Sequence, residues 1–269
     1  CTYPAERFLE FASRGLIGLQ VHGARGDTGA ARFRNVRLRE LPVFGEEQVF
    51  SSWMKGGPGL VVNERGKAQG WRPLFDGQSL AGWQVEGDAQ RYVAKDHELC
   101  FLVGGNGGQL FTSEDYRDFE LRFDFNIARM ANSGLFLRAA RDGSNPAFSG
   151  CEVQILDDFE WETVTNSKLK PWQFTGSLYG SVPAGNHGVL RKPGQWNSYE
   201  VLYKGSRLAV ALNGHILYDV DTFALTPEQG EPFAKRATTG FIGLQHHGSE
   251  HLTGEVMAAF RDVLVRKIE

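Results

Sequence analysis

The clearest pattern in the chain is a strict alternation of apolar and polar residues from Phe119 to Ile127. Apolar side chains stand at every second position, and charged or amide side chains fill the positions between them. A period of two predicts a β-strand with one buried face. Related patterns recur along the second half of the chain, at residues 132–138, 151–156, 196–203, 207–212, 215–220, 240–247 and 257–268. Strands at such spacing predict an all-β fold, a β-sandwich or jelly roll of two antiparallel sheets.

Composition agrees with short strands joined by tight turns. The chain has 269 residues, of which 33 are glycine and 19 are phenylalanine. Asn213-Gly214 lies between two apolar runs, which is the strongest short-range signal for a hairpin. Short helical patterns are limited to the neighbourhood of 114–116 and of 227–235. We therefore expect little helix.

Residues 157–195 form one long segment without a regular period, and it is rich in aromatic side chains. Loops of this length are uncommon unless they serve a function or are disordered. The aromatic content argues against disorder. We expect this segment, with Trp172 and Tyr179, to form an aromatic rim beside a binding site.

A short motif occurs near both ends of the chain. Residues 15–23 and 240–248 share the pattern Gly-x-Ile-Gly-Leu-Gln-x-His-Gly, and repetition at this scale indicates tandem copies of a domain. We predict that 1–42 are the C-terminal two-strand tail of a preceding copy, 43–69 a linker, and 70–269 the complete domain. Two strands alone cannot bury a core. The tail is therefore expected to pair with a second copy, with its own domain, or with another chain in a homo-oligomer.

Charge and cysteine content exclude several classes of function. The formal net charge is -3 and no basic stripe stands out, which argues against a nucleic-acid partner. No apolar run is long enough to span a membrane. Cys1, Cys100 and Cys151 are too few and too scattered for a disulfide framework or a zinc site. A cysteine at position 1 would suit a processed bacterial lipoprotein, and we expect a periplasmic or secreted protein.

The segment 150–158 concentrates polar groups that could carry chemistry. Val153 and Ile155 point to one face of the predicted strand, while Glu152 and Gln154 point to the other. By the same parity, the neighbouring strands place further polar side chains on that non-core face, namely Asn132, Arg138, Gln245 and His247. Sugar hydroxyls need such paired donors and acceptors, and sugar rings stack on aromatic faces. The pattern predicts a sugar-binding cleft with Glu152 in its floor.

Simpler interpretations of these residues remain open at this point. Glu152 could pair with Arg138 on a solvated sheet face, and His247 could be a turn residue before Gly248. A metal shared by His246 and His247 is doubtful, because adjacent strand residues point to opposite faces. A serine nucleophile has no support, since the chain lacks a Gly-x-Ser-x-Gly elbow.

Several motifs, in this order, give the chain a resemblance to a known family over about residues 71–269. They are Leu74–Trp83 (LFDGQSLAGW), Asn132–Arg138 (NSGLFLR), Glu152–Asp157 (EVQILD), Tyr179-Gly180, Trp196-Asn197, Asn213-Gly214 and Ile242–Gly248 (IGLQHHG). Each motif is short, but the ordered set resembles the 3-keto-disaccharide hydrolase domain family. This resemblance implies a concanavalin A-like (lectin/glucanase) jelly roll.

The resemblance also implies a substrate class, a glycoside already oxidised to a ketone at C3. A base would remove the proton on C2, the C1–O bond would break by elimination, and water would add to complete hydrolysis. Glu152 and His247 are candidates for base or acid, and Asp157 could orient one of them or hold a metal. A divalent metal is possible as a Lewis acid. The expected donors and positioning residues are Asn132, Arg138, Gln154 and Gln245.

Two other functions stay open. The domain could be a non-catalytic carbohydrate-binding module in a tandem array. It could also be an ordinary glycoside hydrolase acting on unmodified glucans, which needs a second carboxylate at a suitable distance from Glu152. Gln154 in the middle of the strand and the off-register Asp157 argue against that pair.

Overall fold

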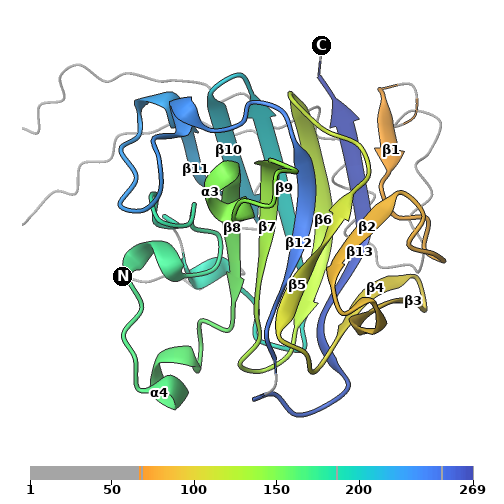
Figure 1. The fold of residues 1–269 in the computed structure, drawn as a ribbon. Helices are drawn as coiled ribbons and strands as arrows, with labels where there is room; N and C mark the ends of the chain where they lie inside the picture. The colour runs from red at the N-terminus through yellow and green to blue at the C-terminus, as the bar shows by residue number, and fades with distance from the viewer. Residues whose placement is uncertain (1–66, 68, 186, 250, 269) are drawn as a thin grey trace, which may run out of the picture. The chain divides into compact units, whose positions relative to one another are not determined.

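The structure is a computed structural model that describes residues 67, 69–185, 187–249 and 251–268. The predicted repeat tail at 1–42 and nearly all of the predicted linker lie outside the described residues. The described part is built from two antiparallel sheets, which Figure 1 shows as stacked layers. The predicted all-β sandwich is therefore confirmed.

The larger sheet has eight strands in the order β11-β10-β9-β6-β13-β4-β3, with β1 paired to β13. Its strands are β1 (Trp71–Pro73), β3 (Tyr92–Lys95), β4 (Glu98–Leu102), β6 (Phe119–Ile127), β9 (Asn197–Lys204), β10 (Arg207–Leu212), β11 (His215–Asp221) and β13 (Val256–Lys267). The smaller sheet has five strands in the order β2-β5-β12-β7-β8. These are β2 (Trp83–Gly87), β5 (Gly107–Thr112), β7 (Asn132–Ala139), β8 (Cys151–Leu156) and β12 (Phe241–His247).

One hydrophobic core fills the space between the sheets. Phe123 and Phe125 of β6, Leu135 of β7, and Val153 and Ile155 of β8 are fully or almost fully buried in it. Each of these residues comes from the apolar half of an alternating strand, so one face of each sheet is committed to the core. The opposite face of the smaller sheet remains available for a site.

Helices are few and short. The α-helices are α3 (Pro146–Ser149) and α4 (Trp161–Thr165), and the 3-10 turns are η2 (Ala89–Arg91), η3 (Pro171–Gln173), η4 (His187–Val189), η5 (Thr222–Ala224) and η6 (Phe233–Lys235). The helix predicted near 114–116 is wrong, because Tyr116 forms a β-bridge with Gly240 instead. The helix predicted over 227–235 is reduced to η6. None of the helices in the described ranges has the length and apolarity needed to cross a membrane.

The long aromatic segment after β8 lies along the free edge of that strand. The backbone N–H groups of Gly176 and Tyr179 donate to the carbonyls of Gln154 and Glu152, both at 2.9 Å, and Gln154 donates to Ser177 at 3.0 Å. These bonds satisfy an edge that would otherwise expose unpaired backbone groups. The segment therefore forms a wall beside the outer face of the smaller sheet.

Candidate functional site

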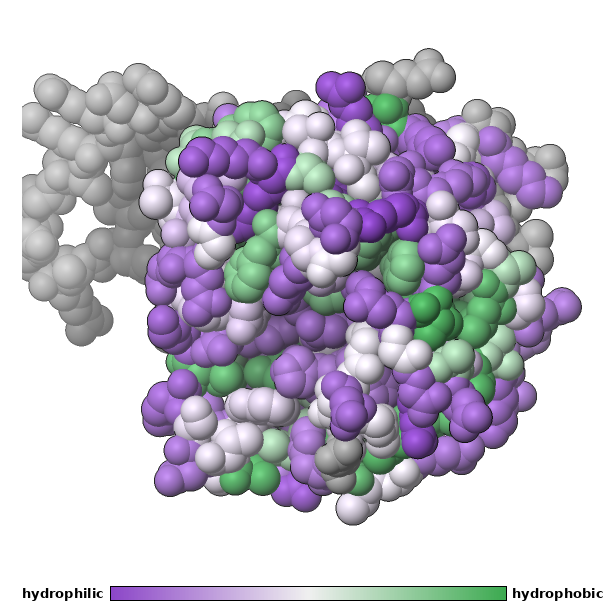
Figure 2. Space-filling view, viewed as in Figure 1, coloured by the Kyte–Doolittle hydropathy of each residue, from purple (hydrophilic) through white to green (hydrophobic). Residues whose placement is uncertain are grey.

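A polar pocket of about 270 Å³ lies on the outer face of the smaller sheet. Figure 2 shows hydrophilic residues around a hollow on the side of the molecule viewed in Figure 1. Six side-chain amides line the pocket: Asn132, Asn145, Gln154, Gln173, Gln229 and Gln245. The other lining residues are Ala147, Phe148, Glu152, Leu156, Trp161, Leu169, Tyr179 and His247. Among these described lining residues, Glu152 is the single carboxyl group and His247 the single imidazole.

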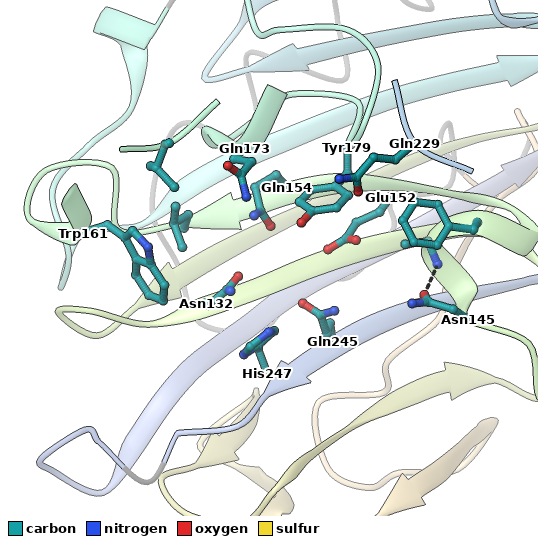
Figure 3. Close-up of a pocket in the computed structure, with 14 residues that line it drawn as sticks. Asn132, Asn145, Glu152, Gln154, Trp161, Gln173, Tyr179, Gln229, Gln245 and His247 are labelled. Carbon is teal, nitrogen blue, oxygen red and sulfur yellow. Dashed lines mark hydrogen bonds between the residues drawn. The ribbon is translucent and has the colours of Figure 1, made fainter. Parts of the chain in front are cut away.

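Strand pairing explains why these groups meet. In β7 and β8, Gly134 lies opposite Gln154, and Phe136 lies opposite Glu152. Strand β12 follows β7 in the sheet and contributes Gln245. Figure 3 shows Glu152, Gln154 and Gln245 side by side over the three strands. The face predicted from strand parity is therefore the face that carries the pocket.

Glu152 is held as an isolated carboxyl group. Its residue is only 4% exposed, and a Cβ at Gly134 would lie 2.2 Å from its Oε1 atom, so the missing side chain at 134 makes room for the carboxyl. Loss of hydration disfavours the charged form. Burial alone raises the pKa of Glu152 to about 8. At neutral pH this carboxyl therefore carries a proton.

The raised pKa predicts a pH-dependent contribution to stability. Between the ordinary pKa of 4.5 and about 8, the unfolded chain releases the Glu152 proton while the folded chain keeps it. As the pH rises through that window, the free energy of unfolding therefore falls by about 3–5 kcal/mol in total. Above the window the carboxyl is ionised in both states, and its contribution no longer changes with pH. We expect the free energy of unfolding of wild type to fall relative to that of Glu152→Gln from about pH 5 to 8.

Denaturant titrations of both proteins across this pH range measure that difference. Asp158 and Glu200, whose pKa values burial also raises to about 7, are common to the two proteins and cancel in the comparison. A difference that does not change with pH would show that Glu152 titrates as an ordinary carboxyl.

His247 ends β12 and lies at the rim of the pocket (Figure 3). Although the residue is exposed, the pocket wall removes part of the water around its ring, and this desolvation lowers the pKa of His247 below 6.5. The nearby His251 adds to the effect. His246 points to the other face, where its Nε2 lies 2.9 Å from the Leu102 carbonyl. His247 is therefore mostly neutral at neutral pH. It lines the pocket, whereas His246 lies on the opposite face of the sheet.

The pocket does not have the donors expected of a divalent metal centre. In the part of the chain that the structure describes, no group of three or more His, Cys, Asp or Glu side chains could hold an ion. One carboxyl in the floor and one imidazole at the rim are fewer ligands of these kinds than the three that a catalytic zinc site has. We therefore assign no step to a metal.

Two pocket amides, Asn132 and Gln154, differ in the hydrogen bonds that they make. The Oδ1 atom of Asn132 is inaccessible to water and makes no hydrogen bond to the described residues. The Oε1 atom of Gln154 accepts from the N–H of Ile155 at 3.1 Å, which assigns its amide nitrogen to the pocket as a donor. The Gln154 amide nitrogen is therefore a hydrogen-bond donor that the pocket floor offers to an oxygen atom of a ligand.

The prediction that Arg138 lies in the pocket is wrong. Strands β7 and β12 pair at Phe136–Gly243 and again at Ala139–Phe241. Between these pairs β7 has two residues and β12 has one, which is a β-bulge. Within it Arg138 takes a left-handed φ of 54°. This bulge breaks the period of two. The Arg138 side chain is buried, pairs with Asp118 at 2.9 Å, and lies 3.5 Å over the ring of Tyr203. The alternative in which Arg138 neutralises Glu152 is thereby also wrong.

Asp157 and Trp172 lie close to the pocket but outside its lining. Strand β8 ends at Leu156, so Asp157 turns away, and its carboxylate accepts the N–H groups of Met130 at 2.8 Å and Phe159 at 3.1 Å. Trp172 is 2% exposed and packs edge-on against Tyr179, with 4.9 Å between ring centroids. Asp157 therefore supports the turn after β8, and Trp172 supports Tyr179, which does line the pocket.

Several lining residues escaped the sequence interpretation because they come from loops. Asn145 caps α3, because its side-chain oxygen accepts a hydrogen bond from the N–H of Ala147 at 3.0 Å, the bond drawn in Figure 3. An Asn directly before a proline is a sequence signal for such a cap. Gln229 has no local pattern that marks it. The buried guanidinium of Arg236 donates to the carbonyls of Gln229, Ala147 and Gly150, and so fixes both loops.

Comparison with known proteins shows which family the chain belongs to. Residues 70–266 match the model of the family described as "3-keto-alpha-glucoside-1,2-lyase-like domain". A protein of Bacteroides thetaiotaomicron named 3-keto-disaccharide hydrolase is 25% identical over 222 residues, which cover 68% of this chain and 76% of that protein.

Two crystal structures from Parabacteroides distasonis, both provisionally described as a glycosyl hydrolase, have the same fold at 26% identity. One has a TM-score of 0.63 and covers 78% of this chain and 99% of its own. The other has a TM-score of 0.59 and covers 74% and 99%. Since the family model spans most of the chain, the resemblance inferred from the sequence is confirmed, and the chain belongs to the 3-keto-alpha-glucoside-1,2-lyase-like domain family.

Proposed function

We propose that this protein cleaves glycosides that carry a ketone at C3, by abstraction of the C2 proton, elimination and hydration. The observation that carries the proposal is Glu152, a buried carboxyl with a pKa near neutrality among neutral amide groups. Family membership and the name of the Bacteroides relative support the substrate class. Groups with a pKa near the working pH are the most effective acid–base catalysts.

The chemistry balances without a redox partner. The C3 ketone acidifies the C2–H bond, and a base takes that proton while the bonding electrons form an enediolate. Those electrons then form the C1–C2 double bond as the C1–O bond breaks, and the leaving oxygen takes up a proton. Water adds across the double bond to give the free 3-keto sugar. The step needs one base, one acid and hydrogen-bond donors for the oxygen at C3.

The carboxyl group and the imidazole of the pocket are suited to opposite roles. Glu152 holds its proton at neutral pH, because burial raises its pKa to about 8. His247 is mostly neutral, because its pKa is lowered. Environments that push two pKa values apart assign the acid and the base. Glu152 thus protonates the leaving oxygen in this proposal, and His247 accepts the C2 proton.

The amides position the sugar. Asn132, Gln154 and Gln245 line the same pocket as Glu152 and His247 and come from the same three strands (Figure 3). Their N–H₂ groups can donate to the C3 oxygen as it gains negative charge, and their carbonyls can accept sugar hydroxyls. This set replaces the predicted contribution of Arg138.

The pocket geometry argues against the two-carboxyl mechanism of an ordinary glycosidase. Retaining and inverting glycosidases place two carboxyl groups on either side of the scissile bond. Glu152 is the one carboxyl among the described lining residues, and Asp157 is occupied by two backbone N–H groups. A carbohydrate-binding module remains the main rival, since it needs no acid or base.

The test compares a 3-keto-glucoside with the same glucoside before oxidation, in deuterated water. We expect cleavage of the keto compound alone, with deuterium incorporated at C2 of the product. Cleavage of both compounds at similar rates would indicate an ordinary hydrolase. Binding without turnover of the keto compound would indicate a binding module. The periplasmic or secreted location and the pairing of the repeat tail with a second copy or in a homo-oligomer stay predictions.

A further inference from the structure

The end of β12, where His247 lies, depends on β5 for its backbone pairing. Strand β12 pairs with β7 as far as Leu244, whereas its pairing with β5 continues to its last residue, where His247 lies opposite Gly107. Residues 102–108 lead from the end of β4 in the larger sheet into β5 in the smaller one, and we call them the crossing loop. The position of His247 therefore depends on this loop.

The crossing loop and the end of β12 approach each other backbone to backbone. A Cβ at Gly107 would lie 2.9 Å from the carbonyl oxygen of His246 and 3.1 Å from the nitrogen of Gly248. Gly107 also has a φ of 97°, which a residue with a side chain rarely adopts. A glycine in a strand often marks such a close approach of two backbones. The loop therefore packs directly on the residues before and after His247.

Two buried side chains attach the same loop to the chain around His247. Before it, the Nε2 atom of His246 lies 2.9 Å from the carbonyl oxygen of Leu102. After it, the Ser249 hydroxyl accepts a hydrogen bond from the N–H of Gly104 at 2.8 Å and donates to the Gly104 carbonyl at 3.3 Å. Ser249 is 0% exposed and His246 is 2% exposed, so both attachments are shielded from water.

These attachments reach the imidazole through Gly248. Loss of water and the nearby His251 lower the pKa of His247, while an interaction with the Gly248 backbone acts the other way and favours the protonated ring. A Cβ at Gly248 would lie 3.4–3.6 Å from backbone atoms of Gly105 and Asn106, so Gly248 packs on the crossing loop. A base that takes up a proton is helped by a polar group fixed in place before the reaction.

We propose that Ser249 is a positioning residue, which attaches the crossing loop to the end of β12 and so holds the His247 imidazole in place beside the substrate. This inference rests on the proposed function, in which His247 accepts the C2 proton. Ser249 lies outside the pocket lining, so its effect passes through His247. A general base acts only within hydrogen-bond reach of the proton that it removes, and a displacement of about 1 Å slows the reaction.

The test replaces Ser249 by alanine and follows the His247 ring by NMR titration, with His247→Gln to assign its signal. Ser249→Ala should raise the pKa of His247 towards 6.5, because a looser strand end returns water to a ring whose pKa burial lowers. His246 and His251, the titratable groups that act on the ring, are present in both proteins. With a methyl 3-keto-glucoside, kcat should fall about 10- to 100-fold while KM changes less than about 2-fold.

Ser133→Ala is the matched control. The Ser133 hydroxyl is also 0% exposed and donates to a backbone carbonyl of β12, that of Gln245, at 2.7 Å. It contacts β12 from β7 and not from the crossing loop, so the pKa of His247 should stay at its wild-type value. An unchanged pKa or an unchanged kcat in Ser249→Ala overturns the inference, and so does an equal effect of Ser133→Ala.

Thermal unfolding shows whether each variant is folded. If Ser249→Ala does not fold, Gly107→Ala disturbs the same contact from the side of the loop and should raise the pKa of His247 in the same way. If the wild type cleaves no 3-keto-glucoside, the proposed function fails, while the NMR titration still decides whether Ser249 positions His247.

Discussion

Glu152→Gln is expected to lower kcat/KM for a 3-keto-glycoside with an alkyl leaving group by about 10²- to 10⁴-fold, the usual contribution of a general acid or base. The substitution is nearly isosteric and fits the same space beside Gly134. It replaces a carboxyl that can give up a proton by an amide that cannot. Steady-state kinetics at pH 7 measure the loss.

The leaving group separates the two roles proposed for Glu152 and His247. A 4-nitrophenolate departs without protonation, so a 4-nitrophenyl 3-keto-glucoside should recover most of the activity lost in Glu152→Gln. The same substrate should not rescue His247→Gln, because C2 proton removal is still required. Rescue of His247→Gln with no rescue of Glu152→Gln would reverse the assignment and make Glu152 the base.

Gly134→Ala is expected to lower kcat/KM by about 10- to 100-fold, since displacement of a catalytic group by about 1 Å has effects of this size. A methyl group at 134 would lie 2.2 Å from Glu152 Oε1 and 3.0 Å from its carboxyl carbon. The flexible Glu152 side chain can swing aside, so the fold should tolerate the change. Alanine also suits a strand better than glycine does.

A double-mutant cycle tests whether Gly134 acts through Glu152. If it does, Gly134→Ala should cost far less activity in the Glu152→Gln protein than in wild type. Thermal unfolding of the four proteins checks that the sheet is intact. Equal losses in both backgrounds would mean that position 134 affects catalysis by a route other than the carboxyl.

Strand alternation carried most of the information about the fold and about the floor of the site. A buried face demands apolar residues at every second position, so the sequence predicts which side chains share the other face. That is how Asn132, Glu152, Gln154, Gln245 and His247 could be grouped from a sequence alone, although they lie on three strands. Their roles in the reaction remain predictions.

The errors arose where the backbone leaves that regular period. A bulge turns Arg138 away from the pocket, and Asp157 lies one residue beyond the end of β8. Asn145 and Gln229 come from loops, whose positions depend on contacts such as those of Arg236 with distant carbonyls. Local sequence patterns contain no record of such contacts.

The hydrogen bonds between the long aromatic segment and β8 also bear on how substrate reaches Glu152. Tyr179 belongs to the pocket wall, and its backbone N–H is bonded to the carbonyl of Glu152 in the floor. Opening this wall as a hinged lid would break the Gly176, Gln154 and Tyr179 bonds together and expose the edge of the sheet. We therefore expect this wall to stay in place during substrate entry and product release, without a gating step of its own.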